Sequence, residues 1–230
     1  MRRWEEMPVW MQKSEVREYY EILQKHRGSL VIKKIFDIVV AILLATILFP
    51  VMIFLAVFIK IDSQGPVFYR QERITAYGKT FKIHKFRTMV NHADQIGTAI
   101  TVERDDRVTR IGRILRKYRL DEIPQLIDIL EGNMSFVGTR PEVAKYVKTY
   151  TPEMWATLLL PAGITSDASI RYKDEANLLK DASDVDKIYT EQVLPEKMKY
   201  NLDALRRFSF FREVKTMFGT LAAVMRQDKI

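Results

Sequence analysis

The chain has 230 residues, of which 47% are hydrophobic and 29% are charged, so it can bury a core and general disorder is excluded. It carries 37 Lys and Arg against 29 Asp and Glu, a formal net charge of +8 that favours anionic partners such as nucleic acid, phosphorylated small molecules or a membrane surface. The absence of cysteine excludes disulfide scaffolds, thiolate zinc sites and a cysteine nucleophile.

The first expected elements are a short helix and a long apolar segment. Ser14 can cap a helix over residues 14–27, and Gly28 would end it. Residues 38–59 then run for 22 residues without a charge, close to the roughly 20 residues that span the hydrocarbon core of a bilayer. This run begins too late and is too long for a secretory signal peptide. The sequence therefore predicts a helix inserted in a membrane.

Whether this helix crosses the bilayer depends on Pro50 and on the flanking charges. Pro50 removes one backbone hydrogen bond and clashes with the carbonyl of Thr46, so it predicts a kink. Residues 18–37 and residues 60–79 each contain four Lys or Arg, so the charge rule favours neither orientation. A helix that bends at Pro50 and returns keeps all of these cations on the cytoplasmic face, near anionic lipid. We therefore expect a re-entrant helix, with a kinked single span as the alternative.

The remaining elements are shorter. Residues 67–69 and 80–83 are expected to form the two strands of a hairpin. Residues 106–119 are expected to be a helix with arginines along one side, followed by a second helix over residues 121–131. Residues 206–230 are predicted to form a basic amphipathic helix, suited equally to the membrane interface and to docking on the protein core.

Several common catalytic motifs are absent from the sequence. The glycines are not spaced as G-x-G-x-x-G, and Gly78 with Lys79 cannot end a Walker A loop because Arg73 stands where its first glycine is required. The histidines form no H-E-x-x-H pair, and there is no G-x-S-x-G elbow. NAD chemistry, P-loop ATP hydrolysis, zinc hydrolysis and the serine-hydrolase elbow therefore have no support.

A pair of carboxylates, Asp121 and Glu122, stands directly after the arginine-rich helix. If Asp121 is an N-cap, Pro124 falls in the first helical turn, and the free amides at this helix end would face a bound anion. A carboxylate placed there can attack a phosphoryl group when Mg²⁺ and arginines screen the charge repulsion. The alternative is a plain capping Asp followed by a first-turn Glu.

Basic side chains gather around this pair in the sequence and favour the phosphate interpretation. Arginine grips phosphate oxygens with its planar fork, and lysine supplies a point charge. The basic residues are Lys82, Lys85, Arg87, Arg116, Arg119 and Arg140. Next to a membrane segment they indicate a diphosphate substrate or lipid headgroups.

Five segments resemble the bacterial sugar transferase family, the monotopic polyprenyl-phosphate phosphoglycosyl transferases. These segments, in chain order, are KKIFDIVVAILLATILFPVM, GPVFYRQERI, FKIHKFRTM, RLDEIPQLIDILEGNMSFVGTRPE and PAGIT. The resemblance covers about residues 31–225. It implies transfer of a sugar-1-phosphate from a nucleotide sugar, commonly a UDP-sugar, to undecaprenyl phosphate, with release of UMP, as the first membrane step of exopolysaccharide or glycoconjugate synthesis.

The resemblance also implies site roles, a cofactor and a location. Asp121 would be the nucleophile that carries a covalent phosphosugar, and Glu122 its partner, with Mg²⁺ bound by both. Arg116 and Arg140 would hold phosphate, and Lys85 and Arg87 would belong to a substrate-lining motif. The family implies the cytoplasmic face of the bacterial inner (plasma) membrane, contact with membrane lipid and no nucleic-acid partner, while the oligomeric state stays open.

The expected fold class is mixed α/β and mostly helical. It is a monotopic membrane protein with a re-entrant helix-break-helix, a small β-hairpin and interfacial amphipathic helices. Its expected parts are an N-terminal helical segment, the re-entrant membrane helix, a cytoplasmic catalytic domain and a C-terminal amphipathic helix, over residues 1–30, 31–61, 62–205 and 206–230.

The sequence departs from the family pattern at several positions. Thr139 stands where proline is usual before Arg140, and Phe49 precedes Pro50 where serine is common. After the PAGIT segment, SDASIRYKDE replaces the more frequent pattern, so the identity of the sugar cannot be carried over from the better-known branch.

Two other functions remain open at this stage. The first is a membrane-bound glycosyltransferase that uses Asp184-Val185-Asp186 as a D-x-D metal site. The second is a membrane-tethered basic module that binds nucleic acid or an acidic polymer through residues 107–119. This second reading leaves the carboxylates beside the basic run unexplained, because they would repel the ligand.

Overall fold

The computed structural model describes residues 1–91, 93, 105–172 and 184–225 of the chain. The α-helices of this part are α1 (Ser14–Lys25), α2 (Arg27–Asp62), α3 (Arg110–Lys117), α4 (Gln125–Leu130), α5 (Ala144–Val147), α6 (Asp167–Arg171), α8 (Val185–Ile188), α9 (Leu194–Arg206) and α10 (Phe210–Met225). The 3-10 turns are η1 (Trp4–Glu6), η2 (Val9–Met11), η3 (Ala76–Gly78), η5 (Leu120–Glu122) and η6 (Met154–Leu159), and η7 (Tyr189–Val193) is a π-helical turn. The strands are β1 (Phe68–Ile74), β2 (Thr80–Phe86), β3 (Met134–Val137) and β4 (Ala162–Thr165). The prediction of a mostly helical fold with a small antiparallel hairpin is confirmed.

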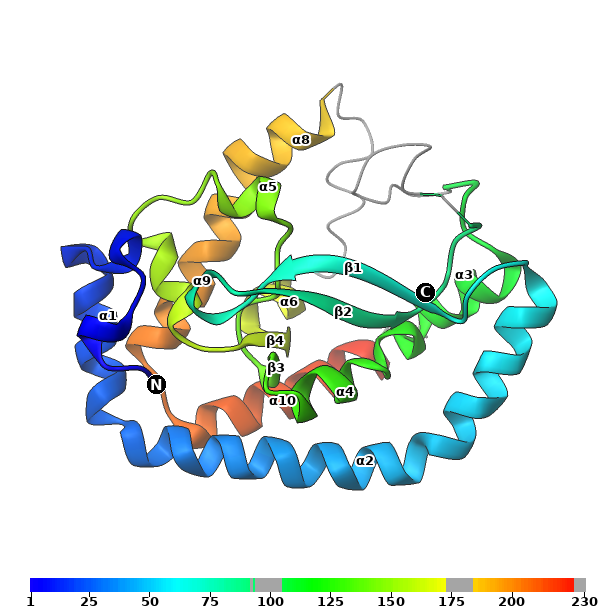
Figure 1. Cartoon of the computed structure of the whole chain (residues 1–230), viewed down its shortest axis with the longest axis horizontal. Coiled ribbons are helices and arrows are strands. Elements are labelled where there is room, and N and C mark those ends of the chain that lie inside the picture. The colour runs from blue at the N-terminus through cyan, green and yellow to red at the C-terminus, as the bar shows by residue number, and fades with distance from the viewer. Residues whose placement is uncertain (92, 94–104, 173–183, 226–230) are drawn as a thin grey trace.

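The longest element is α2, which runs for 36 residues, or ~54 Å at the α-helical rise. By length and composition it is able to cross a membrane. Gly28 lies inside α2 instead of ending the preceding helix, and α2 continues through Pro50 as one helix. Figure 1 shows α2 as a bowed helix that carries the rest of the protein on its concave side. The expected break is therefore a bend within a continuous helix.

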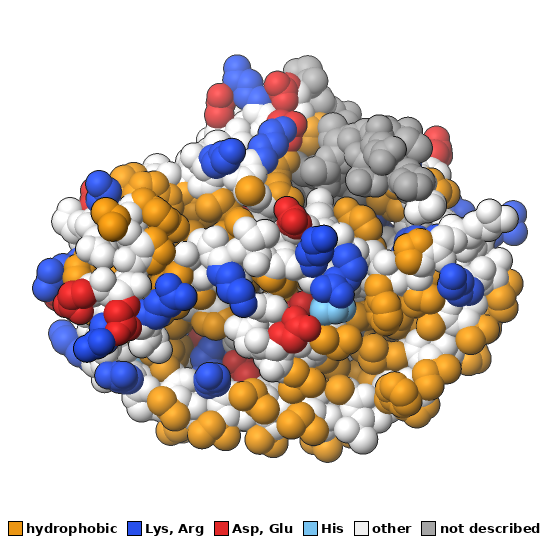
Figure 2. All heavy atoms as spheres, viewed as in Figure 1, with side chains coloured by type: hydrophobic (Ala, Val, Ile, Leu, Met, Phe, Trp, Pro, Cys, Tyr) orange, Lys and Arg blue, Asp and Glu red, His pale blue; other side chains and the backbone are white. Residues whose placement is uncertain are grey.

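The burial pattern of α2 is the reverse of that of a helix in a water-soluble core. Only Lys33, Asp37, Ala41 and Ile59 are buried, and two of these are charged. Its exposed large hydrophobic residues are Val31, Ile32, Ile35, Val39, Ile42, Leu43, Ile47, Phe49, Val51, Ile53, Phe54, Val57, Phe58 and Ile61. Figure 2 shows hydrophobic side chains along the edge of the molecule that α2 occupies. Since so large an apolar face is not stable in water, it indicates contact with lipid or another apolar partner.

Both ends of α2 are attached to the body of the protein by polar side chains. Near the start, the Lys33 ammonium donates to Ser135 Oγ at 2.5 Å and to the Val137 carbonyl at 3.1 Å, both in β3. At the far end, the Asp62 carboxylate accepts a hydrogen bond of 3.0 Å from the Ile111 amide of α3. One body of protein therefore contacts the helix at both ends.

The β1–β2 hairpin is longer than its predicted strands, and its register pairs Tyr69 with Lys85. The connection contains Tyr77 and Gly78, both with positive φ. A Cβ at Gly78 would lie 2.7 Å from the Trp10 ring, so this turn requires glycine for both its backbone angles and its packing. Phe81 and Ile83 of β2 pack in a core cluster with α4, β3 and Ala41 of α2.

The strands β3 and β4, which were not predicted, pair in parallel. Both strands are short, and their closest approach uses two glycines, because a Cβ on Gly163 would lie 2.2 Å from the Gly138 amide nitrogen. The Thr139 carbonyl accepts a 2.9 Å hydrogen bond from the Gly163 amide. This contact fixes the backbone immediately before Arg140, where proline was expected.

The prediction of one helix over residues 121–131 with Asp121 as its N-cap is wrong. Arg119 adopts a left-handed conformation (φ 56°) after α3, and the chain then forms the 3-10 turn η5, which contains Asp121. Within this turn the Ile123 amide donates to the Leu120 carbonyl in the 3-10 pattern, and α4 begins after Pro124, which is its N-cap residue.

The C-terminal helix, predicted over residues 206–230, is observed as α10. It packs against α2, α6, β3 and β4, with Thr216 buried among them. Phe211, Phe218 and Leu221 are exposed on the same helix. It therefore docks on the protein core through one face and presents an apolar second face.

Candidate active site

Asp121 and Glu122 lie together in η5, where α3 and β2 cover them. Each residue is almost fully buried, with 8% and 9% of its surface exposed. Burying two adjacent carboxyl groups is unfavourable unless cations or hydrogen bonds compensate them. The two carboxyl groups differ sharply in the cations and hydrogen bonds that compensate them.

The Glu122 carboxylate is held by basic side chains from three elements. Lys85 Nζ of β2 lies 3.1 Å from Oε1, and Arg140 Nη2, after β3, lies 2.5 Å from the same oxygen. Arg119 adds a longer ion pair of 3.8 Å. Burial alone would raise the pKa of the Glu122 carboxyl, but Arg140 and Lys85 hold it well below its usual range. Glu122 is therefore ionised and fixed in orientation.

The Asp121 carboxylate accepts no hydrogen bond from any residue in the described part of the chain. Burial, followed by repulsion from Glu122, raises the pKa of the Asp121 carboxyl, while Lys85, Arg116 and Arg140 oppose the rise. A carboxylate whose lone pairs are uncommitted is available as a nucleophile or as a metal ligand. Glu122 is thus fixed by its cation partners, whereas the Asp121 carboxylate is available to react or to bind a metal ion.

The structure brings three of the four predicted substrate-binding cations around this pair. Arg140 and Lys85 contact Glu122 directly. Arg116, on the last turn of α3, donates through Nε to Thr88 Oγ1 at 2.8 Å, which leaves its two Nη groups for other partners. Burial lowers the pKa values of the Arg116 and Lys85 cations, and the Glu122 carboxylate raises that of Arg140.

The fourth predicted cation, Arg87, has a different position. Its guanidinium donates to the carbonyls of Ser63 at 2.7 Å and of Ile59 at 3.4 Å, and also to that of Gln64. These carbonyls lie at the C-terminal end of α2, where helical carbonyls lack intrahelical partners. Arg87 therefore caps α2 and connects it to β2, only two residues beyond Lys85.

One partly buried cation near the site, Arg73, was not among the predicted site residues. Arg73 of β1 donates to the Pro141 carbonyl at 3.2 Å and to Gln71 Oε1 at 2.6 Å, and its electrostatic neighbours include Arg140 and Glu142. Burial lowers the pKa of the Arg73 guanidinium. The local sequence gives no signal for it, because Arg73 lies beyond the strand expected over residues 67–69 and the face that it occupies depends on the hairpin register.

A cavity of about 380 Å³ lies beside Glu122, and we call it the α2–α10 cavity. Arg119 and Arg140 line its polar end. Its other walls are largely apolar and come from α2, α4, β3, β4, α6 and α10. Asp121, Lys85 and Arg116 are not among its lining residues.

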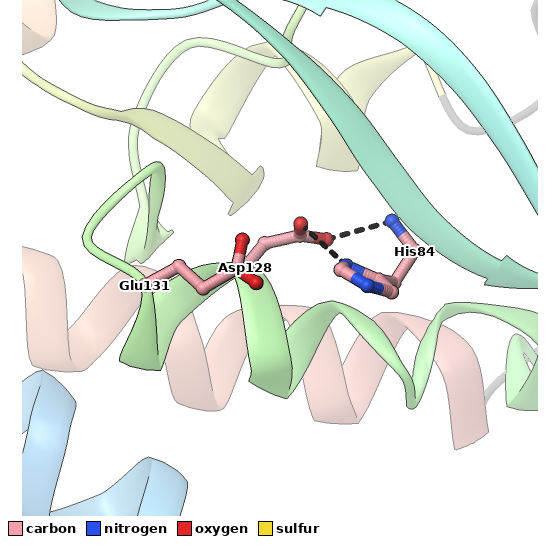
Figure 3. Close-up of side chains that lie close together, drawn as sticks. All are labelled: His84, Asp128 and Glu131. Carbon is pink, nitrogen blue, oxygen red and sulfur yellow. Dashed lines mark hydrogen bonds and ion pairs between the residues drawn. The ribbon is translucent and has the colours of Figure 1, made fainter.

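A second group of acidic side chains lies on α4 and at its end. The Asp128 carboxylate accepts a hydrogen bond from the His84 amide at 2.9 Å and lies 2.8 Å from the His84 ring Nδ1, so both of its oxygens face His84 (Figure 3). The Glu131 carboxylate approaches within 4.8 Å of this pair but is exposed and bonded to the Asn133 amide. Because Asp128 is already committed, this group is a clip between β2 and α4.

The tripeptide Asp184-Val185-Asp186 has structural partners. Asp184 caps α8 by accepting from the Lys187 amide, and Asp186 accepts from Lys145 and Tyr146. These contacts fix the tripeptide at α8 and α5, where it contacts neither Asp121 nor Glu122. The geometry therefore gives the D-x-D reading no support.

The site is thus a pair of buried carboxylates, ringed by cations, that lies between a small hairpin and a long apolar helix. Arginine and lysine side chains can bind phosphate oxygens, and carboxylates can bind a metal ion. The model of the bacterial sugar transferase family matches residues 28–227. The chain belongs to this family, and it is a transferase.

Individual relatives agree with the family assignment. Over 85% of its length the chain is 33% identical to a UDP-glucose:undecaprenyl-phosphate glucose-1-phosphate transferase of Caulobacter vibrioides, 70% of which is covered. It is 32% identical over 84% of its length to a UDP-N-acetylgalactosamine-undecaprenyl-phosphate N-acetylgalactosaminephosphotransferase of Aeromonas hydrophila, of which 44% is covered. It is 46% identical over 49% of its length to the exopolysaccharide production protein PSS of Rhizobium leguminosarum, of which 56% is covered. The chain therefore spans only part of the first two of these relatives, which are longer than it is.

Proposed function

We propose that the chain transfers a sugar-1-phosphate from a UDP-sugar to undecaprenyl phosphate through a covalent intermediate on Asp121, with release of UMP. The observation that carries this proposal is the contrast between Glu122, fixed by Lys85 and Arg140, and Asp121, whose carboxylate has no hydrogen-bond partner among the described residues. The names of the relatives supply the substrate classes. The reaction belongs to the first membrane step of exopolysaccharide or glycoconjugate synthesis.

In the first half of the reaction, a carboxylate oxygen of Asp121 attacks the phosphorus that carries the sugar. The bond from this phosphorus to the bridging oxygen breaks, and UMP leaves with that oxygen. In the second half, an oxygen of the lipid phosphate attacks the same phosphorus and the Asp121 carboxylate is released. Splitting one displacement into two allows two anionic substrates to use one site in turn.

The cations around the pair provide the electrostatic part of this mechanism. Arg116 and Arg140 offset the charge that develops on the departing phosphate, and Lys85 holds Glu122 in place. The donor set also fits Mg²⁺, because Asp121 offers uncommitted oxygens and Glu122 lies beside it. When bound by Asp121 and Glu122, Mg²⁺ would neutralise charge on the diphosphate.

We place the protein in a monotopic position on the cytoplasmic face of the inner membrane, and the attachment of both ends of α2 to one body supports the monotopic part of this proposal. If α2 crossed the bilayer as a straight span, the segments that bind Lys33 and Asp62 would lie on opposite sides of the hydrocarbon core, which is ~30 Å thick. A bowed helix with its exposed apolar face in one leaflet avoids this conflict. Single cysteines replacing Val31 and Ser63 test it: a membrane-impermeant thiol reagent should reach both from the same side, and labelling from opposite sides would refute the arrangement.

The covalent step is tested without the lipid acceptor. Purified protein with Mg²⁺ and either UDP-glucose or UDP-N-acetylgalactosamine should release UMP in a single burst of about one per active site. Mass spectrometry should then find a hexose-phosphate adduct on the peptide that contains Asp121. Asp121→Asn should give neither product while staying folded, with a melting temperature at least as high as that of the wild type. An adduct on another residue, or turnover by Asp121→Asn, would contradict the proposal.

A further inference from the structure

The α2–α10 cavity has a charged end and apolar walls, and these walls extend to the exposed apolar surface of α2 and α10. Its polar end, at Glu122, includes Arg119 and Arg140. Leu44 and Leu48 of α2 form part of its wall, and Leu221 of α10 lines it while being 57% exposed. The cavity is therefore open to the apolar surroundings of α2 and α10, and it suits a long apolar chain that ends in an anion.

Arg119 has unused capacity to bind an anion at this end. In the described part of the chain its guanidinium makes one ion pair, 3.8 Å from Glu122, and no hydrogen bond. Glu122 is already matched by Lys85 and Arg140, which lie closer to it. The Arg119 side chain is 42% exposed. It is thus the charged group of the cavity least committed to the protein itself.

The backbone at Arg119 supports the same conclusion. A non-glycine residue with φ 56° is strained, because its Cβ crowds the following carbonyl. Such strain persists where the surrounding fold requires it and is concentrated at ligand sites. Arg119 lies in the turn between α3 and the carboxylate pair, and its side chain lines the cavity. A glycine would have formed the same turn without strain.

The two sides of the carboxylate pair are also different. Arg116 and Lys85 approach from α3 and β2 and do not line the cavity, whereas Arg119 and the apolar walls do. The charged diphosphate and the sugar hydroxyls of a nucleotide sugar find few polar partners along apolar walls. A lipid phosphate gains from both the walls and the cation at their end.

We propose that the α2–α10 cavity is the acceptor site, where the phosphate-proximal part of a polyprenyl phosphate lies along the apolar walls and its phosphate meets Arg119. This inference rests on the proposed function. From this position an oxygen of the lipid phosphate attacks the phosphorus held on Asp121, and the bond between that phosphorus and the Asp121 carboxylate breaks.

A matched pair of variants on α10 tests the apolar walls. Ala223 lines the cavity, whereas Ala222, its neighbour in sequence, is exposed and does not. Ala223→Phe should raise the KM for undecaprenyl phosphate by about tenfold or more, the scale on which an apolar pocket distinguishes its ligands. The UMP burst without lipid should be unchanged. Ala222→Phe should alter neither quantity.

A second pair tests the charged end. Arg119→Gln should raise the KM for undecaprenyl phosphate by about tenfold, because it removes one charge-assisted contact to the acceptor phosphate, and should lower the UMP burst far less, because Glu122 keeps its closer partners Lys85 and Arg140. Arg119→Lys should recover part of the loss. Arg113→Gln, an exposed cation of α3 outside the cavity, is the control and should behave as the wild type. A reduced burst with unchanged lipid KM in Arg119→Gln would place Arg119 on the donor side and overturn the proposal.

A binding measurement separates this inference from the transfer mechanism. A polyprenyl phosphate that carries a photoreactive diazirine near its phosphate should label residues 43–48 or residues 220–223 of the wild type, and Ala223→Phe should reduce that labelling. This readout does not require a covalent intermediate on Asp121, so absence of the UMP burst would refute the mechanism alone. Equal labelling by an unphosphorylated prenol or by a phospholipid probe would show a general lipid cleft and overturn the acceptor site.

Discussion

Two acidic clusters lie within one short stretch of the chain and face β2 in different ways. In the first, Asp121 and Glu122 are surrounded by cations, and one of the two carboxylates accepts no hydrogen bond from the described residues. In the second, Asp128 gives both oxygens to His84, and Glu131 lies at the surface. The first cluster keeps a reactive group available, whereas the second uses its acid to join a strand to a helix.

The difference shows why ligand spacing alone is a poor guide to function. The His84, Asp128 and Glu131 group has ligand atoms close enough for a metal ion, but its buried members already satisfy one another. In the Asp121 site, by contrast, the carboxylate has cations nearby but no hydrogen-bond partner among the described residues. Its acid is held in a buried position by neighbouring cations without being hydrogen-bonded to them.

The strongest test of this comparison makes the same substitution in both clusters. Asp121→Asn should lower UMP production by about a thousandfold or more, because an amide cannot act as the nucleophile. Asp128→Asn should retain most of the turnover, because its side chain contacts β2 and not the substrate. Turnover is measured as UMP release with a UDP-sugar, Mg²⁺ and undecaprenyl phosphate. Similar losses in the two variants would remove the distinction between the clusters.

The next effect concerns the cations that only the first cluster has. Arg140→Gln should reduce turnover by about a hundredfold, the usual loss when one group that stabilises developing charge is removed. It also leaves buried Glu122 with Lys85 as its remaining close partner, so the melting temperature should fall. Arg113→Gln, an exposed arginine on α3, provides the matched control. Unchanged turnover in Arg140→Gln would mean that the cation serves stability alone.

A smaller effect is expected for the stability of the second cluster. Asp128→Asn should lower the free energy of unfolding by about 1–2 kcal/mol, because the amide cannot accept from both the His84 amide and its ring. Urea denaturation in detergent micelles measures this change. Glu131→Gln should leave stability unchanged, since its carboxylate is exposed. A loss in Glu131→Gln equal to that in Asp128→Asn would indicate that the three side chains act as one unit.

Much of the first cluster could be predicted from sequence, and most of the second could not. The motif around Asp121 and Glu122 and the spacing of Lys85, Arg116 and Arg140 identify residues that the fold does bring together. The His84–Asp128 clip joins two elements whose relative position depends on the hairpin register and on the start of α4. No local sequence pattern predicts the hairpin register or the residue at which α4 begins.

The same limit applies to two local features of the site. Pro124 was compatible with a first-turn position, but the left-handed Arg119 before it turns the chain so that Asp121 enters a 3-10 turn. The motif groups Arg87 with the substrate-binding cations, a role that stays a prediction, and it did not indicate that Arg87 also caps α2. Both outcomes are decided by contacts between segments far apart in the sequence.

The smallest predicted effect compares the two acids of the first cluster through their pH dependence. The pKa of Asp121 is raised by burial and by Glu122, so its ionised form destabilises the fold at neutral pH, and this cost fades as the pH falls through the raised pKa. The pKa of Glu122 is lowered by Arg140 and Lys85 against the effect of burial, so its ionised form stabilises the fold above the pKa of an unfolded glutamate and loses this contribution in acid. Thermal denaturation in micelles should therefore show Asp121→Asn more stable than the wild type at neutral pH and Glu122→Gln less stable, with both differences shrinking as the pH is lowered. Shifts of the same sign would mean that the two carboxylates share one environment, and the division between a fixed acid and an available one would fail.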